Sequence, residues 1–143
     1  MKTVLDTNVL VSGLLTPFGP SGEIVRMVFS GELILCIDSR IISEYQDVLN
    51  RPKFMFNKEP IGILIDFIKQ YAQFISSSPL KSRLPDTDDE PFLEVAIAGK
   101  ARSLVTGNTA HYPVALREGV DIHSPSKFVE FYRKQNKGTE PIA

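Results

Sequence analysis

Apolar residues along the chain form short continuous runs that alternate with longer amphipathic segments. The runs lie at Thr3–Leu5, Leu33–Ile37 and Ser103–Thr106, and such a run is typical of a strand that is covered on both faces. Between the runs, apolar residues recur every three or four positions, which is the spacing of one helix face. This alternation predicts the α/β class, with a three-layer α/β/α sandwich around a central parallel β-sheet.

Turn-forming residues set approximate element boundaries. Asp38 or Ser39 is expected to cap the helix after the second strand, and the turn formers in Thr16–Gly22 predict a loop. Val9–Val11 fits either a helix or a loop. Further helices are predicted around residues 24–29, 41–49, 61–72, 89–100 and 126–132, and further short strands at 74–75 and 120–122.

The chain is expected to form one domain. Its 143 residues, of which 43% are hydrophobic, suffice for a single ordinary core. No repeat or linker-like segment interrupts the pattern. We assign residues 1–132 to this domain and expect residues 133–143 to be a polar, flexible tail.

Charge and cysteine content narrow the class of protein. The formal net charge of −1 argues against a basic module that binds phosphates over its whole surface, but it permits a nuclease with phosphate contacts near one cleft. The single cysteine, Cys36, cannot build an intramolecular disulfide framework. The acid at position 6 leaves no room for a signal peptide, and no apolar run is long enough for a membrane span. We therefore expect a cytoplasmic protein.

Polar side chains follow three of the predicted strands. Asp6 comes directly after the first strand and Asp38 after the second. Thr106 ends the strand that begins at Ser103, and Asn108 follows it. Because sites in open parallel sheets form outside the carboxyl ends of the strands, we expect these side chains to meet at one edge.

Acids on two predicted helices extend this group. Glu44 borders the apolar face of its helix, and Asp89 begins an apolar stripe at i, i+3, i+4 and i+7 spacing, with Asp86 and Asp88 beside it. Clustered carboxylates repel one another unless a cation neutralises them. Mg²⁺ and Mn²⁺ prefer oxygen ligands and can activate water for phosphodiester hydrolysis. Asp6, Glu44 and Asp89 are therefore the predicted ligands of such an ion.

Four motifs around these residues resemble those of the PIN-domain family. They lie at residues 4–10 (VLDTNVL), 42–54 (ISEYQDVLNRPKF), 86–94 (DTDDEPFLE) and 104–108 (LVTGN). Four motifs in order are far more specific than one, and the resemblance extends to about Phe128.

The resemblance implies an α/β/α sandwich and a Mg²⁺- or Mn²⁺-dependent endoribonuclease. Asp6, Glu44 and Asp89 match the acidic positions of the family, and Asn8 matches a polar position that supports the first acid by hydrogen bonding. Within the family the chain resembles the VapC-like toxins of toxin–antitoxin systems. That likeness implies an RNA substrate, an antitoxin protein as partner and a homodimer.

Asn108 departs from the family pattern, which usually carries an aspartate after Thr-Gly. Asparagine can hydrogen-bond and coordinate through its carbonyl oxygen but brings no negative charge. Asn108 therefore favours a second hypothesis, in which a catalytically weakened PIN fold binds RNA or a partner protein. A phosphatase of the haloacid dehalogenase type also has an aspartate after its first strand, but it needs a second acid where this chain has Asn8.

Several candidates also have simpler structural interpretations. Asp38 is interpreted as a helix cap, and Asp86 as a capping or loop residue that could supply some of the missing charge. The Thr106 hydroxyl could line the site. His111 and His123 show no partner in the sequence, so surface or loop roles are expected for both.

Overall fold

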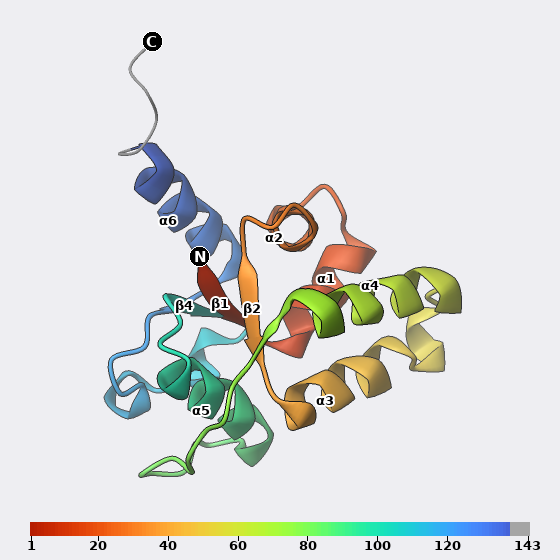
Figure 1. Ribbon diagram of the computed structural model, residues 1–143. Helices are drawn as coiled ribbons and strands as arrows, with labels where there is room; N and C mark the ends of the chain where they lie inside the picture. The colour runs from red at the N-terminus through yellow and green to blue at the C-terminus, as the bar shows by residue number, and fades with distance from the viewer. Residues whose placement is uncertain (138–143) are drawn as a thin grey trace.

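A five-stranded parallel sheet forms the centre of the molecule (Figure 1). The computed structural model describes residues 1–137. The strands lie in the order β3-β2-β1-β4-β5. Their bounds are β1 Lys2–Leu5, β2 Ile34–Ile37, β3 Gln73–Phe74, β4 Ser103–Val105 and β5 Ile122–His123.

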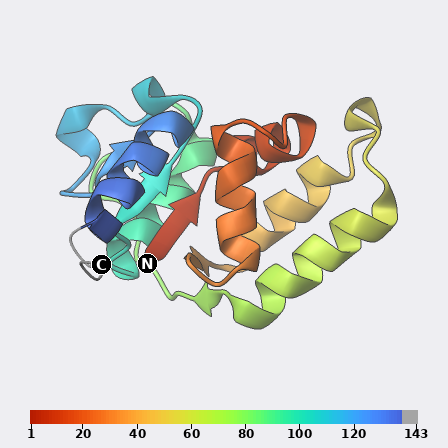
Figure 2. The ribbon, with the colours of Figure 1, turned by 90° about the horizontal axis from the view of Figure 1, so that it is seen from above.

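Helices cover both faces of this sheet, which confirms the predicted α/β/α sandwich (Figures 1 and 2). The α-helices are α1 Thr7–Leu15, α2 Pro20–Phe29, α3 Ser39–Leu49, α4 Lys58–Tyr71, α5 Glu90–Ala98 and α6 Pro125–Lys137. Short 3₁₀ segments are η1 Pro52–Phe54, η2 Thr87–Asp89, η3 Thr109–His111 and η4 Val114–Leu116. Helix α6 packs on β4, β5 and α2, whereas α5 packs on β1, β2 and β4 from the opposite face. Within residues 1–137, no helix combines the length and apolar character needed to cross a membrane.

The central strands are buried because both sheet faces are covered. Leu5 and Leu104 have no exposed surface, and the polar Ser103 is equally enclosed. Cys36 lies in β2 and is a buried free thiol. A sheet of this kind explains why these strands appear in the sequence as continuous apolar runs rather than as alternating patterns.

The strand order creates a switch point between β1 and β4. The chain proceeds outward from β1 through β2 to β3, and then crosses to β4 on the other side of β1. In open parallel sheets, the crevice at such a reversal, beyond the carboxyl ends of the strands, is where ligands bind. Asp6 and Thr106 directly follow β1 and β4, so both lie at this crevice. In Figure 2 the arrow of β1 marks the direction of its carboxyl end.

Several predicted boundaries were wrong for identifiable reasons. The predicted loop Thr16–Gly22 is too long, because Pro20 starts α2 with a φ angle already suited to a helix. The predicted strand at 120–122 is displaced to β5. Glu118 and Gly119 adopt φ angles of 50° and 84°, and the Val120 NH bonds the Arg117 carbonyl oxygen, so Val120 belongs to a turn.

Other boundaries shift at helix ends. The ambiguous Val9–Val11 segment is part of α1. The predicted helix at 89–100 ends at Ala98, with Gly99 as its C-cap. Helix α6 continues to Lys137 and so includes the first part of the predicted tail. Residues 138–143 of that tail lie outside the described residues.

The start of α2 is sensitive to any added side chain. A Cβ atom at Gly22 would lie 2.0 Å from the Pro17 carbonyl oxygen, whereas one at Gly62 in α4 would meet open space. We expect Gly22→Ala to lower the free energy of unfolding by about 1–3 kcal/mol through overpacking. Gly62→Ala should raise it by roughly 0.5–1 kcal/mol because alanine favours a helix interior. Urea denaturation of both variants tests this, and equal effects would contradict the predicted close packing of α2.

Candidate functional site

Asp6 is the most enclosed acid of the candidate site, with 6% of its surface exposed. Its backbone NH continues the β1–β4 pairing by donating to the Val105 carbonyl oxygen at 2.9 Å. Its side-chain Oδ2 accepts hydrogen bonds from the hydroxyls of Thr106 at 2.9 Å and Tyr112 at 3.2 Å. Two strands and the segment after β4 therefore fix this carboxylate in place.

The Thr106 hydroxyl has a defined orientation. Its oxygen accepts the Asn108 NH at 3.1 Å, so its own proton is available for Asp6. The Tyr112 phenol also keeps its proton, because burial and then the nearby Asp6 charge raise its pKa. Both hydroxyls therefore act as donors to a carboxylate that is positioned to accept.

Burial and hydrogen bonding act in opposite directions on Asp6. Removal from water raises the pKa of its carboxyl group, while the Thr106 and Tyr112 hydroxyls and the backbone NH groups of Thr7 and Asn8 lower it. The net result is a raised pKa. Ionised Asp6 is thus only partly stabilised by its protein neighbours.

Glu44 approaches from α3. The Asp38 side chain caps this helix by accepting the Ile41 NH at 3.0 Å, as the sequence predicted. The buried Tyr45 hydroxyl bonds the Leu5 carbonyl oxygen at 2.5 Å and attaches α3 to the end of β1. The adjacent Glu44 is half-buried and accepts a hydrogen bond from the Thr7 hydroxyl.

The charge on Glu44 is also disfavoured. Burial is the main cause of its raised pKa, and repulsion from Asp6 and Asp88 adds to it. The Thr7 hydrogen bond and Arg51 act in the opposite direction. This dependence on Asp6 and Asp88 indicates that the acids of β1, α3 and η2 share one electrostatic environment.

Asp89 lies at the junction of η2 and α5, and 8% of its surface is exposed. Burial, followed by repulsion from Asp6 and Asp86, raises its pKa to about 6. His111 partly opposes this rise, because its Nδ1 lies 3.2 Å from Asp89 Oδ2. The third acid therefore faces both Asp6 and the segment after β4.

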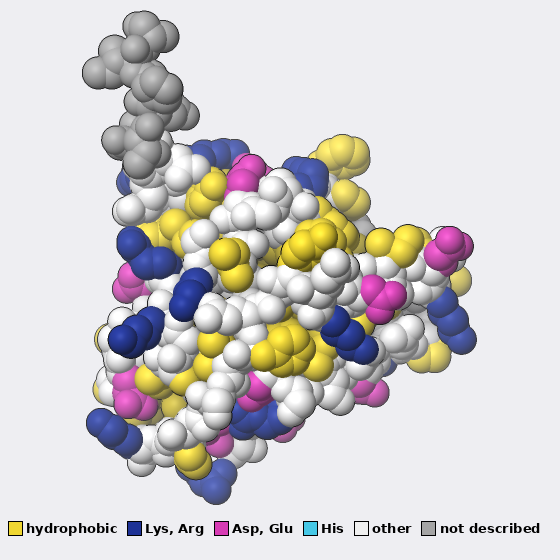
Figure 3. All heavy atoms as spheres, in the orientation of Figure 1, with side chains coloured by type: hydrophobic (Ala, Val, Ile, Leu, Met, Phe, Trp, Pro, Cys, Tyr) yellow, Lys and Arg dark blue, Asp and Glu magenta, His cyan; other side chains and the backbone are white. Residues whose placement is uncertain are grey.

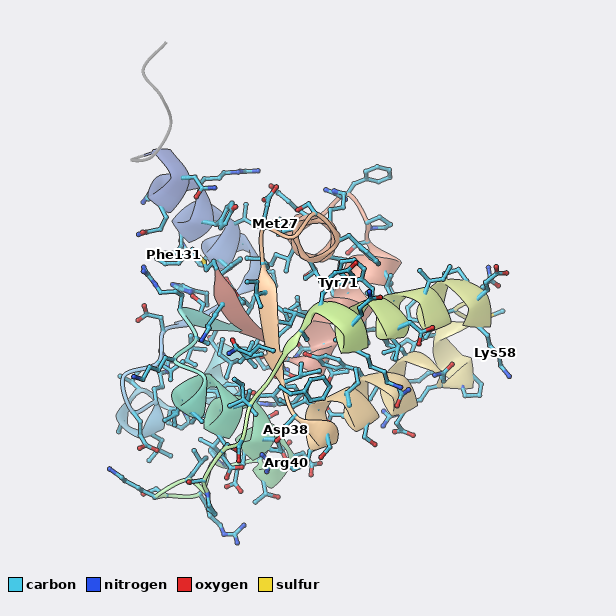
Figure 4. All side chains as sticks on the ribbon, viewed as in Figure 1. Met27, Asp38, Arg40, Lys58, Tyr71 and Phe131 are labelled. Atoms are coloured by element: carbon cyan, nitrogen blue, oxygen red, sulfur yellow. The ribbon has the colours of Figure 1, made fainter. Side chains whose placement is uncertain are left out.

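An ion-pair network joins the two helices that carry Glu44 and Asp89. Arg40, one turn before Glu44, contacts Glu94 of α5 at 2.7 Å and Asp38 at 2.6 Å. Figure 4 shows Asp38 and Arg40 side by side at the start of α3. Glu94 is buried, and its second carboxylate oxygen accepts the Leu80 NH at 3.1 Å. This network holds together α3, α5 and the loop before α5 that carries Leu80.

The other residues proposed from the sequence occupy varied places. Asp86 is exposed and caps η2 by accepting the Asp88 NH at 2.9 Å. The Asn8 side-chain oxygen accepts a hydrogen bond from the Gly107 NH at 3.0 Å. Asn8 does support Asp6 by hydrogen bonding, but through its backbone NH and not through its side chain. Asn108 is exposed, and its NH bonds Thr106.

The expected surface or loop role fits the place of His111, which is exposed and lies in η3, whereas His123 lies in β5. Both histidines have partners that the sequence did not reveal. His111 contacts Asp89, and His123 Nδ1 lies 2.9 Å from the Ser103 hydroxyl oxygen. Tyr112 was not singled out at all. Both His111 and Tyr112 belong to or follow η3, a short 3₁₀ segment without a helical apolar pattern. The feature of the sequence that could have pointed to these two residues is that they follow Asn108 closely in the chain.

The donor set fits a divalent cation. One ligand atom each from Asp86, Asp89 and His111 lies within 4.8 Å of the others, and Asp6 and Glu44 are electrostatically coupled to this neighbourhood. Carboxylates with raised pKa values need a compensating positive charge to ionise together. An oxygen-rich group of this kind suits Mg²⁺, Mn²⁺ or a similar ion.

A group of acids at the switch point of a parallel sheet is a candidate site for the hydrolysis of nucleic acids. The PIN domain family profile matches residues 2–110, which include all four motifs and the acids described above. The chain therefore belongs to the PIN domain family, whose members are generally nucleases that use divalent metals. It is also similar to uncharacterized protein MJ1680 of Methanocaldococcus jannaschii, at 24% identity over 147 residues, covering 94% of this chain and 93% of that protein.

The repulsion at Asp89 predicts an unusual pH dependence of stability without metal. Asp89 has a pKa of about 6 in the folded protein, against an ordinary 3.8. Its protonated, uncharged form avoids the repulsion, so the stabilising contribution of Asp89 is present below about pH 4 and is lost as pH rises through about 6. We expect Asp89→Asn, in chelator, to raise the free energy of unfolding at pH 7.5 by about 1–2 kcal/mol. The gain should shrink at pH 4.5.

Urea denaturation at both pH values measures this effect. Asp66→Asn on the exposed face of α4 is the matched control and should change little at either pH. Equal or lower stability of Asp89→Asn at pH 7.5 would rule out repulsion at Asp89 as a dominant destabilising force.

Proposed function

We propose that this protein is a metal-dependent endoribonuclease that cleaves RNA phosphodiester bonds at the crevice between β1 and β4. The observation that carries the proposal is that Asp6, Glu44 and Asp89, from three separate elements, all have pKa values raised by burial, and that the charge of Asp6 raises those of Glu44 and Asp89 further. Perturbed carboxylates in a crevice are characteristic of functional sites. Membership in a family of nucleases supplies the reaction class.

Each acid has a definite role in the proposal. Asp6, Glu44 and Asp89 hold Mg²⁺ or Mn²⁺, with Thr106 and Thr7 orienting Asp6 and Glu44 through their hydroxyls. Such an ion supplies Lewis-acid activation of water and stabilises the departing oxygen of the phosphodiester. The protein contributes a fixed ligand geometry that does not need to reorganise when RNA binds.

The charge distribution is consistent with a substrate that is held mainly near the crevice. The face seen in Figure 3 carries basic and acidic side chains interspersed, without one continuous basic field. The net charge of −1 agrees with this view. A divalent ion at the acids would convert this acidic group into a phosphate-binding point.

The biological setting belongs to the proposal as well. We propose that the protein is the toxin of a toxin–antitoxin pair, restrained by an antitoxin protein, and that it acts as a homodimer in the cytoplasm. The four motifs and their likeness to VapC-like toxins support this assignment. Co-purification of a small partner that inhibits cleavage would test it directly.

Loss of the first acid should abolish cleavage. Asp6→Asn keeps the size of the side chain but weakens ion binding, and we expect the rate of RNA cleavage to fall at least about 100-fold. The assay uses single-stranded RNA with Mg²⁺ or Mn²⁺ after any co-purified partner has been removed. Asp66→Asn, an exposed acid on α4, is the control and should cleave like the wild type. Equal cleavage by Asp6→Asn would refute the proposed site.

Asn108 supports a second candidate function, an RNA- or protein-binding module with weakened catalysis. It is an exposed, uncharged side chain where the family usually has an acid.

In the endoribonuclease function, we propose that Asn108 still contributes to the catalytic group through its amide. Asn108→Asp should then increase the cleavage rate by about tenfold, equivalent to about 1.4 kcal/mol. Metal-independent RNA binding by the wild type, without cleavage by either form, would favour the binding module.

A further inference from the structure

His111 has no part in the proposed function so far, yet it faces the buried end of Asp89. We propose that its imidazole nitrogen is a direct ligand of the cation held by Asp89 and that this ligand makes the site prefer Mn²⁺ to Mg²⁺. This inference rests on the proposed function, because it identifies the ion and one ligand of the same site. It concerns a residue whose chemistry differs from the carboxylates around it.

The position of His111 is set by the segment after β4. Thr106 follows that strand and bonds Asp6, and η3 then brings His111 to the start of α5, where Nδ1 lies 3.2 Å from Asp89 Oδ2. In an octahedral shell with bonds of about 2.1 Å, neighbouring ligand atoms are about 3 Å apart. The His111–Asp89 separation therefore equals that of two adjacent ligands of one ion, with the ion replacing the shared proton.

A third group extends this pair. Asp86 places a carboxylate oxygen within 4.8 Å of the ligand atoms of both Asp89 and His111. The three residues come from η2 and η3, which are joined to different strands. Their convergence therefore depends on the folded sheet.

A simple surface ion pair explains this arrangement less well. The His111 side chain is 46% exposed, and exposed ion pairs contribute little to stability. Asp89, in contrast, is buried and is repelled by Asp6 and Asp86. A divalent ion shared by Asp89 and His111 places two positive charges next to the buried carboxylate and so offsets that repulsion directly.

Ligand chemistry then determines which ion is preferred. Mg²⁺ favours an all-oxygen shell and retains its waters. First-row transition ions accept imidazole nitrogen more readily than Mg²⁺ does. Asn108 adds no charge at the end of β4, and His111, three residues later, supplies a neutral ligand from the same segment. The site thereby gains a donor that benefits Mn²⁺ and does little for Mg²⁺.

Electron spin echo spectroscopy of bound Mn²⁺ tests the ligand directly, because a coordinated ¹⁴N nucleus modulates the echo. Wild-type protein loaded with Mn²⁺ should show this modulation, and His111→Gln should lose it. The chain has two histidines, so His123→Gln is the matched control and should retain it. Absence of ¹⁴N modulation in the wild type, or its persistence in His111→Gln, would overturn the proposal.

Metal titrations separate this inference from the proposed function. His111→Gln should weaken Mn²⁺ binding by at least about tenfold, as loss of a group around a metal site typically does, with a much smaller effect on Mg²⁺. Mn²⁺ binding that depends on Asp6 but not on His111 would overturn the His111 assignment alone. Mn²⁺ binding that Asp6→Asn leaves unchanged would overturn the proposed metal site itself.

Discussion

Carboxylates that are withdrawn from water and set beside one another resist ionisation, and the crevice at Asp6 combines both effects. Burial raises the pKa of Asp6, Glu44 and Asp89, and the neighbouring charges raise those of Glu44 and Asp89 further. Hydroxyl donors offset only part of this cost. In the proposed function, the remaining imbalance would favour the binding of a cation, so the destabilising and the functional properties would have one origin.

The surrounding structure holds these groups together against their repulsion. Asp6 is fixed by the β1–β4 pairing, and Tyr45 joins α3 to the same strand end. The Arg40–Glu94 contact joins α3 to α5, the helix that follows Asp89. These attachments are a backbone strand pairing, a buried tyrosine hydroxyl and an ion pair between the exposed Arg40 and the buried Glu94. The cation of the proposed function would therefore meet ligands whose spacing is already set.

The fold and the three acids were largely predictable because each depended on a strong local signal. The buried strands were visible as continuous apolar runs, and Asp6 was visible as the acid after the first of them. The contact of Asp6 with Thr106 needed the strand order as well, which local patterns do not determine. His111 and Tyr112 were harder, since 3₁₀ segments lack a recognisable period and the matched family region ends at residue 110. The turn at Glu118 depends on a positive φ angle that glutamate seldom adopts.

The pairing of β1 with β4 also has a consequence for how the chain folds. Thr3 lies opposite Ser103, and Asp6 bonds Tyr112, so the crevice joins segments separated by about a hundred residues of chain. Contacts of such long range close late, because the intervening chain must first lose its freedom. During synthesis, β1 cannot pair with β4 until most of the chain has been made. The hydroxyl partners of Asp6, Thr106 and Tyr112, are thus available to it only after most of the chain has been made.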